Sequence, residues 1–188
     1  YGKINHHVAI EALNSSNSTN DVTTRTAERY LFNYKLDYAV SERGYAFGTI
    51  NYEKDRFSGY KHRVSELIGY GHRFHTSETL KTKAELAVGA RQSKLEIPVN
   101  GDDKEDEGVV KLLGELLWKI SDTSQFSEEL YVEAGEESTI SKSITGLKVN
   151  LNSSLAMKLT YTVKHTSVVP VGNRKTDSES VVTLVYSF

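Results

Sequence analysis

The stretch RYLFNYKLDYAV, residues 29–40, decides the fold because large apolar and aromatic side chains occupy every second position. A period of two predicts a β-strand, whereas an amphipathic helix would space its apolar side chains three and four residues apart. One face of the strand carries Tyr30, Phe32, Tyr34, Leu36, Tyr38 and Val40, and the other carries Arg29, Leu31, Asn33, Lys35, Asp37 and Ala39.

The same period recurs along the whole chain, for example in GVVKLLGELLWKI at 108–120 and LAMKLTYTVKH at 155–165. No segment shows a helical period. We therefore predict an all-β, antiparallel fold in one domain, residues 1–188. The ten expected strands are 2–13, 26–40, 44–55, 59–74, 79–93, 108–120, 124–134, 140–151, 155–167 and 179–188.

The connections between these strands alternate in length, which favours an up-and-down barrel with one short-turn rim and one elaborated rim. Bacterial outer-membrane barrels have this asymmetry, with short periplasmic turns and longer extracellular loops. The expected short turns are 41–44, 76–79, 121–124 and 152–154, and the longer connections are 14–26, 55–59, 95–108, 134–139 and 167–179.

Composition excludes several classes of protein. The 188 residues carry a formal charge of −2, so no general basicity indicates nucleic-acid binding, and the lack of cysteine excludes disulfides and Cys-ligated metals. The chain begins with Tyr rather than Met and shows no leader, which predicts a processed chain. No apolar run approaches the roughly 18 residues of a spanning helix, but this test does not detect membrane strands.

Alternation alone fits either a soluble ligand-binding barrel or a membrane barrel with the apolar face outward. Strands near bilayer length favour the membrane barrel, as do aromatic side chains near the strand ends, although aromatic residues also suit strands in general. The expected aromatic girdle comprises Tyr38, Phe74, Trp118, Phe126, Tyr186 and Phe188 beside the short turns, and Tyr30, Tyr52 and Tyr60 beside the longer loops.

The final stretch VVTLVYSF, residues 181–188, places Leu184, Tyr186 and Phe188 on one face. This pattern is similar to the terminal signal by which outer-membrane barrels are recognised for assembly. It predicts the barrel-assembly machinery as a partner during biogenesis, and membrane lipid and lipopolysaccharide as the surroundings.

Several stretches resemble the YdiY-type salt-induced outer-membrane proteins, a family with a domain of unknown function. They are TAERYLFNYKLDYAVSERGYAFGTINYEKDRFSGY at 26–60, LWKISDTSQFSEELYVEAGE at 117–136, KLTYTVKHTS at 158–167 and TLVYSF at 183–188. The resemblance implies a multi-pass β-barrel in the outer membrane of a Gram-negative bacterium. Because residues 1–13 resemble a third strand of such proteins, it also implies a further hairpin and twelve strands in an intact barrel. It supplies no catalytic residues.

The charged face would line the lumen of such a barrel, with basic side chains outnumbering acidic ones. Two interpretations stay open: a packed ion-pair network that fills a narrow barrel, or a water-filled path that favours anions. The basic residues are Lys3, Arg29, Lys35, Arg63, Lys81, Lys83, Arg91, Lys111, Lys142, Lys148, Lys158 and Lys164, and the acidic ones are Glu11, Asp37, Glu53, Glu85, Glu115, Glu129 and Glu133.

Enzymatic and metal sites are not expected. His62, His72 and His75 with Ser65 and Glu66, or His165 with Ser167, form no spacing that singles out a catalytic set, and no GxSxG or HExxH motif occurs. His6 and His7 should point to opposite faces of a strand and cannot chelate together, so no metal or cofactor is predicted. The acidic run 101–107 fits a solvated loop better than a cation site.

The function expected from the sequence is therefore a small outer-membrane barrel, either a narrow anion-leaning channel or a structural envelope protein of salt stress, with oligomerisation open. The alternatives are a lipid-modifying barrel enzyme and, third, a soluble lipocalin-like carrier. One residue breaks the pattern: Glu66 falls on the apolar face near mid-strand. We expect a β-bulge to turn Glu66 inward, or another protein surface to cover it.

Overall fold

The computed structural model describes residues 3–19, 22–99 and 101–186, which form one antiparallel ten-stranded sheet. Every strand pairs with its neighbours in the sequence, and the described residues contain no helix, as the period of two predicted. The strands are β1 (Ile4–Thr19), β2 (Val22–Ala39), β3 (Gly44–Asp55), β4 (Tyr60–Thr76), β5 (Leu80–Val99), β6 (Asp102–Lys119), β7 (Ser124–Gly135), β8 (Thr139–Asn150), β9 (Leu155–Thr166) and β10 (Thr176–Tyr186).

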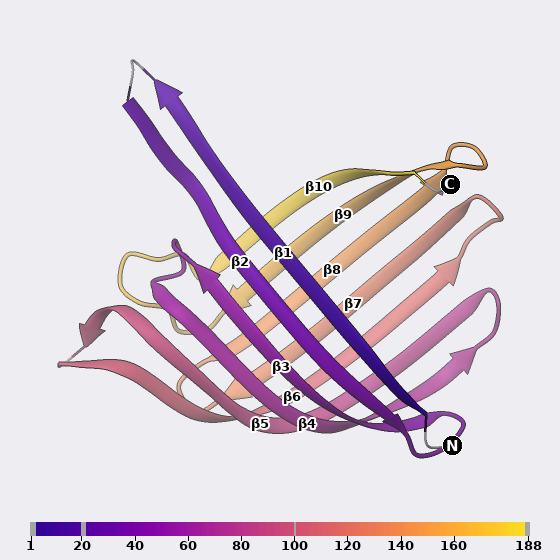
Figure 1. Ribbon diagram of the computed structural model, residues 1–188, viewed down its shortest axis with the longest axis horizontal. Coiled ribbons are helices and arrows are strands. Elements are labelled where there is room, and N and C mark those ends of the chain that lie inside the picture. Colours follow the sequence, from indigo (N-terminus) through magenta and orange to yellow (C-terminus); the bar gives the residue numbers. More distant parts are fainter. Residues whose placement is uncertain (1–2, 20–21, 100, 187–188) are drawn as a thin grey trace.

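The sheet curls into a half-barrel, with a concave and a convex face (Figure 1). The strand order runs from β1 to β10 without closing, because no described residue of β1 pairs with β10. The predicted up-and-down, all-β architecture is therefore confirmed. Within the described ranges, no helix is long and apolar enough to cross a membrane.

The two rims differ as the connections predicted. The start of β1 pairs through Ile4 with Tyr38, beside the turn 40–43, and the end of β10 pairs through Tyr186 with Leu155, beside the turn 151–154. The start of β1 and the end of β10 therefore both lie at the short-turn rim, on the right of Figure 1.

At the opposite rim, two of the expected long loops are largely β-structure, which corrects the prediction. The hairpin β1–β2 continues through residues expected as loop, and the hairpin β5–β6 turns at Gly101, whose φ of 87° suits glycine. These extensions are rich in Ser, Thr, Asn and Asp, so they lack the apolar contrast by which a strand is recognised. Pro98 lies where the β5–β6 register shifts between Lys94 and Val99, a position that tolerates its missing N–H.

A small apolar core fills the concave side of β3–β6. Tyr45, Phe47, Leu67, Ala87 and Val109 are buried there in one cluster. Glycines on β4 make room for the two rings, since a Cβ at Gly71 would lie 2.2 Å from the Tyr45 ring and one at Gly69 would lie 2.7 Å from Phe47. The remainder of the concave side carries charged and polar side chains, with further apolar ones such as Leu113 and Ile140.

Candidate functional site

The charged residues predicted to share one face do lie on the concave face of the sheet. Cross-strand register decides this, because residues directly opposite one another on paired strands point to the same side. Arg63, Glu85, Arg91 and Glu133 are buried there. The other predicted residues follow the same alternation, except that Lys3 precedes the first residue of β1.

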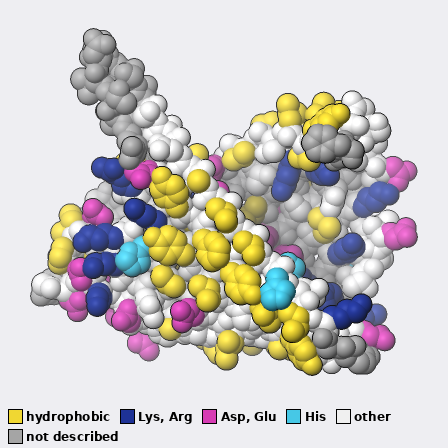
Figure 2. All heavy atoms as spheres, in the orientation of Figure 1, with side chains coloured by type: hydrophobic (Ala, Val, Ile, Leu, Met, Phe, Trp, Pro, Cys, Tyr) yellow, Lys and Arg dark blue, Asp and Glu magenta, His cyan; other side chains and the backbone are white. Residues whose placement is uncertain are grey.

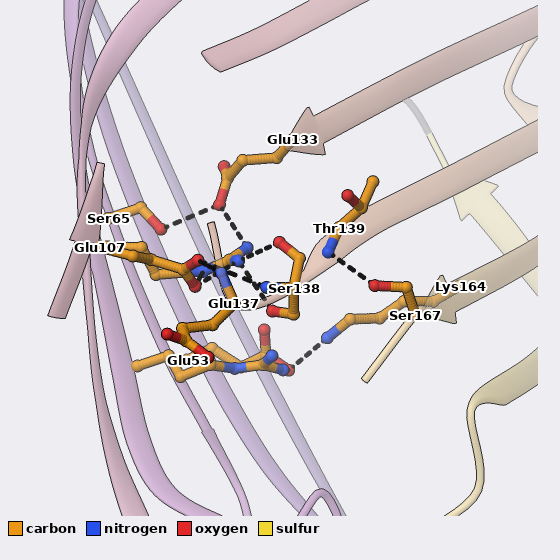
Figure 3. A network of polar contacts seen from close by, with 11 residues as sticks. Glu53, Ser65, Glu107, Glu133, Glu137, Ser138, Thr139, Lys164 and Ser167 are labelled. Carbon is orange, nitrogen blue, oxygen red and sulfur yellow. Dashed lines mark hydrogen bonds and ion pairs between the residues drawn. The ribbon is translucent and has the colours of Figure 1, made fainter. Parts of the chain in front are cut away.

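The tightest cluster surrounds Arg91 of β5, which is only 1% exposed. Figure 3 labels its partners Glu107, Glu133 and Ser138. Its guanidinium donates to Glu107 of β6 at 2.6 Å and 2.9 Å, and to Glu133 of β7 at 3.0 Å. It also donates to the backbone carbonyl of Ser138 at 2.7 Å, while Glu107 accepts a hydrogen bond from the Glu137 N–H at 2.8 Å. The cluster therefore fastens the β7–β8 connection to β5 and β6 at the long-loop rim.

A second cluster joins strands that are distant in the sheet. Glu53 of β3 accepts hydrogen bonds from Arg63 of β4 at 3.1 Å and from Lys164 of β9 at 2.6 Å. Arg29 of β2 bridges in the same way to Glu179 of β10 at 2.7 Å, and it also pairs with Glu11 of β1. Because these pairs span the curl of the sheet, they hold its two halves together.

A third cluster lies toward the short-turn rim and centres on Glu85 of β5. Its carboxylate accepts hydrogen bonds from Lys35 and Tyr45, and Lys83 lies between Glu85 at 3.5 Å and Glu115 at 2.8 Å. Lys35 also lies 3.7 Å from Asp37. Acidic and basic charges nearly balance in this part of the concave face.

The balance fails elsewhere on the concave face. Of the predicted acidic residues, Glu129 alone lacks an ion pair within the described chain, whereas six basic residues lack one. Lys111 instead lies over the Tyr131 ring, 4.2 Å from its centroid. The six are Lys3, Lys81, Lys111, Lys142, Lys148 and Lys158. Among the predicted lining residues, basic side chains without an ion pair therefore outnumber acidic ones.

A cavity of about 250 Å³ opens at the short-turn rim, where it is lined by Lys81, Lys119, Lys148 and Gln125 and by the carboxylates of Glu78 and Asp122. In the turn beside it, Lys119 donates a hydrogen bond to Asp122 at 2.7 Å, which lowers the pKa of the Asp122 carboxyl. The two unpaired lysines, Lys81 and Lys148, belong to the cationic excess. This cavity forms one mouth of the concave space.

The convex face is apolar and exposed, with Ile10, Ile68 and Leu184 at 76%, 70% and 67% exposure. Figure 2 shows such hydrophobic side chains spread over the hairpin β1–β2 and its surroundings. The predicted aromatic residues on this face are Tyr38, Phe74, Trp118, Phe126 and Tyr186 toward the short turns, and Tyr30 and Tyr52 toward the other rim. Of the predicted assembly signal, Leu184 and Tyr186 are exposed, and Phe188 lies outside the described residues.

Tyr60 does not belong to the aromatic girdle, and its prediction is wrong. A β-bulge shifts the register between Tyr60 and His62, so Tyr60 lies on the concave side at 6% exposure, with Arg63 4.6 Å from its ring centroid. Strict alternation would place Tyr60 on the same face as Val64, four residues later, and this prediction fails at the bulge. A bulge gives no signal in the alternation itself.

The carboxylates of Glu66 and Glu128 point outward among the apolar side chains of the convex face. Glu66 does so because β4 has register shifts only near its two ends, so the predicted inward rotation by a bulge at Glu66 is wrong. Glu128 of β7 was missed, although its alternation with Phe126 and Leu130 indicates this face. It accepts hydrogen bonds of 2.7 Å from both Ser143 and Thr145 of β8.

The histidine and serine candidates are not brought together. His62 stacks on Tyr52 on the convex side, while Ser65 is buried on the concave side 3.4 Å from Glu133. His6 and His7 point to opposite faces of β1. His6 lies 2.8 Å from the Tyr34 hydroxyl, and His7 lies 3.2 Å from the Asp37 carboxylate. Among the described residues, no group of three or more His, Asp or Glu side chains is placed to hold a metal ion.

An antiparallel, up-and-down half-barrel with an apolar outer face and an ion-paired inner face defines a β-barrel-like protein. The chain belongs to the DUF481 family of proteins of unknown function, whose model matches residues 2–188. This match confirms the family resemblance seen in the sequence. Comparison with curated proteins finds no significant match.

Proposed function

We propose that this protein is a small outer-membrane β-barrel of a Gram-negative bacterium whose lumen admits anions in preference to cations. Its membrane location is supported by the convex face, where large apolar side chains stay exposed around the sheet. A soluble barrel would bury such side chains inside and place its charges outside, and here the arrangement is reversed.

In this proposal the short-turn rim faces the periplasm and the hairpins β1–β2 and β5–β6 extend outward, toward lipopolysaccharide. In the acidic stretch 101–107 of the β5–β6 hairpin, Asp102, Lys104 and Asp106 are exposed and their charges remain in water, whereas Glu107 is buried against Arg91. The aromatic side chains near both rims of the convex face fit headgroup depth. The barrel-assembly machinery would meet Leu184 and Tyr186 on the last strand.

The observation that carries the anion preference is that more basic than acidic side chains on the concave face lack an ion-pair partner. The predicted acidic groups other than Glu129 are held in ion pairs, while Lys111 of β6, Lys142 and Lys148 of β8 and Lys158 of β9 are not. A lumen lined by uncompensated cations raises the local concentration of anions and repels cations. The three ion-pair clusters narrow the path, so conduction, where it occurs, is small.

The test is single-channel recording of the full chain in a planar bilayer with a salt gradient across it. We expect a reversal potential of the sign that reports anion preference, and a weaker preference in Lys111→Gln. Cation preference would overturn the proposed selectivity. A bilayer without any conductance would show that the ion pairs fill the interior, and the structural envelope role would replace the channel.

A further inference from the structure

The concave surface of β7–β10 beside the short turns carries a patch of hydrogen-bond donors without a carboxylate. Gln125, Lys148, Lys158 and Thr183 lie in direct register across the four strands. The adjacent row on the same face is Ser127, Gly146, Thr160 and Val181. Two ammonium groups, an amide and three hydroxyls therefore share one small area.

Within this patch, Lys148 and Lys158 face each other as a cross-strand pair. Directly opposed residues have Cβ atoms about 4.5–5.5 Å apart, and like charges at that spacing are destabilising. Neither lysine has an ion-pair partner within the described chain. The other facing lysines of these strands, Lys142 and Lys164, differ because Lys164 is neutralised by Glu53 at 2.6 Å. An anion between Lys148 and Lys158 would remove their repulsion.

Gly146 forms the floor of the patch. A Cβ at this buried position would lie 2.4 Å from the Ser127 hydroxyl oxygen and 3.7 Å from Cε of Lys158. The hydroxyl and the lysine side chain therefore both lie over Gly146, and Thr160 lies directly opposite it on β9. The missing side chain leaves space in which three donor groups converge.

The patch is open at the short-turn rim. Lys148 and Gln125 also line the cavity there. Figure 2 shows Lys and Arg side chains within the hollow beside the hairpin β1–β2. A ligand can therefore reach the lysine pair from the rim.

We propose that Gln125, Ser127, Lys148, Lys158 and Thr160 form a binding site for a phosphate group. The inference rests on the proposed function, because it places a defined anion on the cationic face. Two ammonium charges match a phosphomonoester, lysines bind phosphate as point charges, and hydroxyl and amide donors satisfy its remaining oxygens. The group is presented either by free phosphate or by the headgroup of a lipid.

The experiment is calorimetric titration of the full chain, folded in non-ionic detergent, with inorganic phosphate and separately with dihexanoyl phosphatidic acid. We expect binding that weakens about tenfold or more in the double variant Lys148→Gln/Lys158→Gln, since charge-assisted hydrogen bonds are lost. The matched control is Lys54→Gln/Lys104→Gln, which removes two exposed charges outside the patch and should bind like the original protein.

Binding of one or both ligands that weakens in the double variant supports the site. The ligand that binds shows whether the phosphate is free or belongs to a lipid. Equal affinity in the double variant, or no binding in either arm, would overturn it. Circular dichroism and the emission of the single tryptophan, Trp118, verify that the variants fold. Bilayer recordings separate the two proposals: cation preference of the original protein defeats the proposed function, whereas anion preference with phosphate binding unchanged in the double variant defeats the site alone.

Discussion

Lys164 of β9 donates a hydrogen bond to Glu53 of β3 at 2.6 Å, which joins two strands that are six positions apart in the sheet. Arg63 shares the same carboxylate oxygen at 3.1 Å. The sheet can make this contact only when it curls. The pair is therefore a marker of the half-barrel shape as well as a source of its stability.

Replacing Glu53 by Gln should destabilise the protein because it leaves Arg63 and Lys164 without their shared partner. The pair is about one-fifth exposed, so the expected loss is on the order of 1–3 kcal/mol, between the values for exposed and buried ion pairs. Urea unfolding in lipid vesicles, followed by Trp118 emission, measures it. Lys119→Met, which breaks an exposed pair with Asp122, is the control and should change little. A Glu53→Gln midpoint equal to that control would show that the cross-sheet pair contributes nothing.

Arg91→Met should cost more, about 3–5 kcal/mol, because it leaves Glu107 and Glu133 buried without their cation. The β7–β8 connection should also loosen, since its backbone is held by the same cluster. Amide hydrogen exchange at Glu137 and Ser138 should accelerate in a milder variant, Arg91→Lys, in which the charge remains and the forked geometry is lost. Unchanged exchange in Arg91→Lys would show that the connection is held by other contacts.

The strands could be predicted from the sequence because an apolar face beside a polar face is a local property, readable from residues such as Tyr34 and Lys35. The extensions of β1–β2 and β5–β6 could not, since polar residues on both faces give no contrast. Tyr60 was misplaced because one bulge reverses the alternation. The ion-pair partners depend on the curl of the whole sheet: nothing local relates Glu53 to Lys164, or Arg29 to Glu179.

The orientation of the barrel can be tested with single cysteines, since the chain has none of its own. Lys104→Cys lies in the β5–β6 hairpin at the long-loop rim and Thr123→Cys lies in a short turn, and both sites are exposed. On intact cells, a membrane-impermeant maleimide should label position 104, and it should label position 123 only after the outer membrane is permeabilised. The reverse labelling would invert the proposed topology.

Glu105, in the part of the β5–β6 hairpin beyond the apolar belt, gives a pH-dependent prediction. Partial burial, with the nearby carboxylates of Glu137 and Glu107, raises the pKa of Glu105. A carboxyl whose pKa is higher in the folded state destabilises that state as pH rises above its ordinary range. Glu105→Gln should therefore raise the thermal midpoint near neutral pH and leave it unchanged in acid, where Glu105 is protonated in both states. Asp106→Asn, on an exposed neighbour, is the control. An equal shift of the thermal midpoint at both pH values would show that the effect does not come from the raised pKa of Glu105.

Glu66 and Glu128 both point outward from the sheet, but their surroundings differ. Glu128 is held by the hydroxyls of Ser143 and Thr145, whereas Glu66 lies in a shallow apolar depression between Ile50 and Ile68 and has no hydrogen-bond or ion-pair partner in the described chain. A carboxylate that faces lipid is unfavourable, though less so than Lys or Arg, which lose about 2–4 kcal/mol at the midplane.

Glu66→Leu should therefore increase resistance to urea in lipid vesicles. Glu128→Leu should gain less or lose stability, because it leaves two hydroxyls without their acceptor. Cross-linking before and after each substitution reports the oligomeric state. Should Glu66→Leu instead lower stability and abolish an oligomer, Glu66 would face a second protein surface rather than lipid, and the depression around it would be part of a subunit interface.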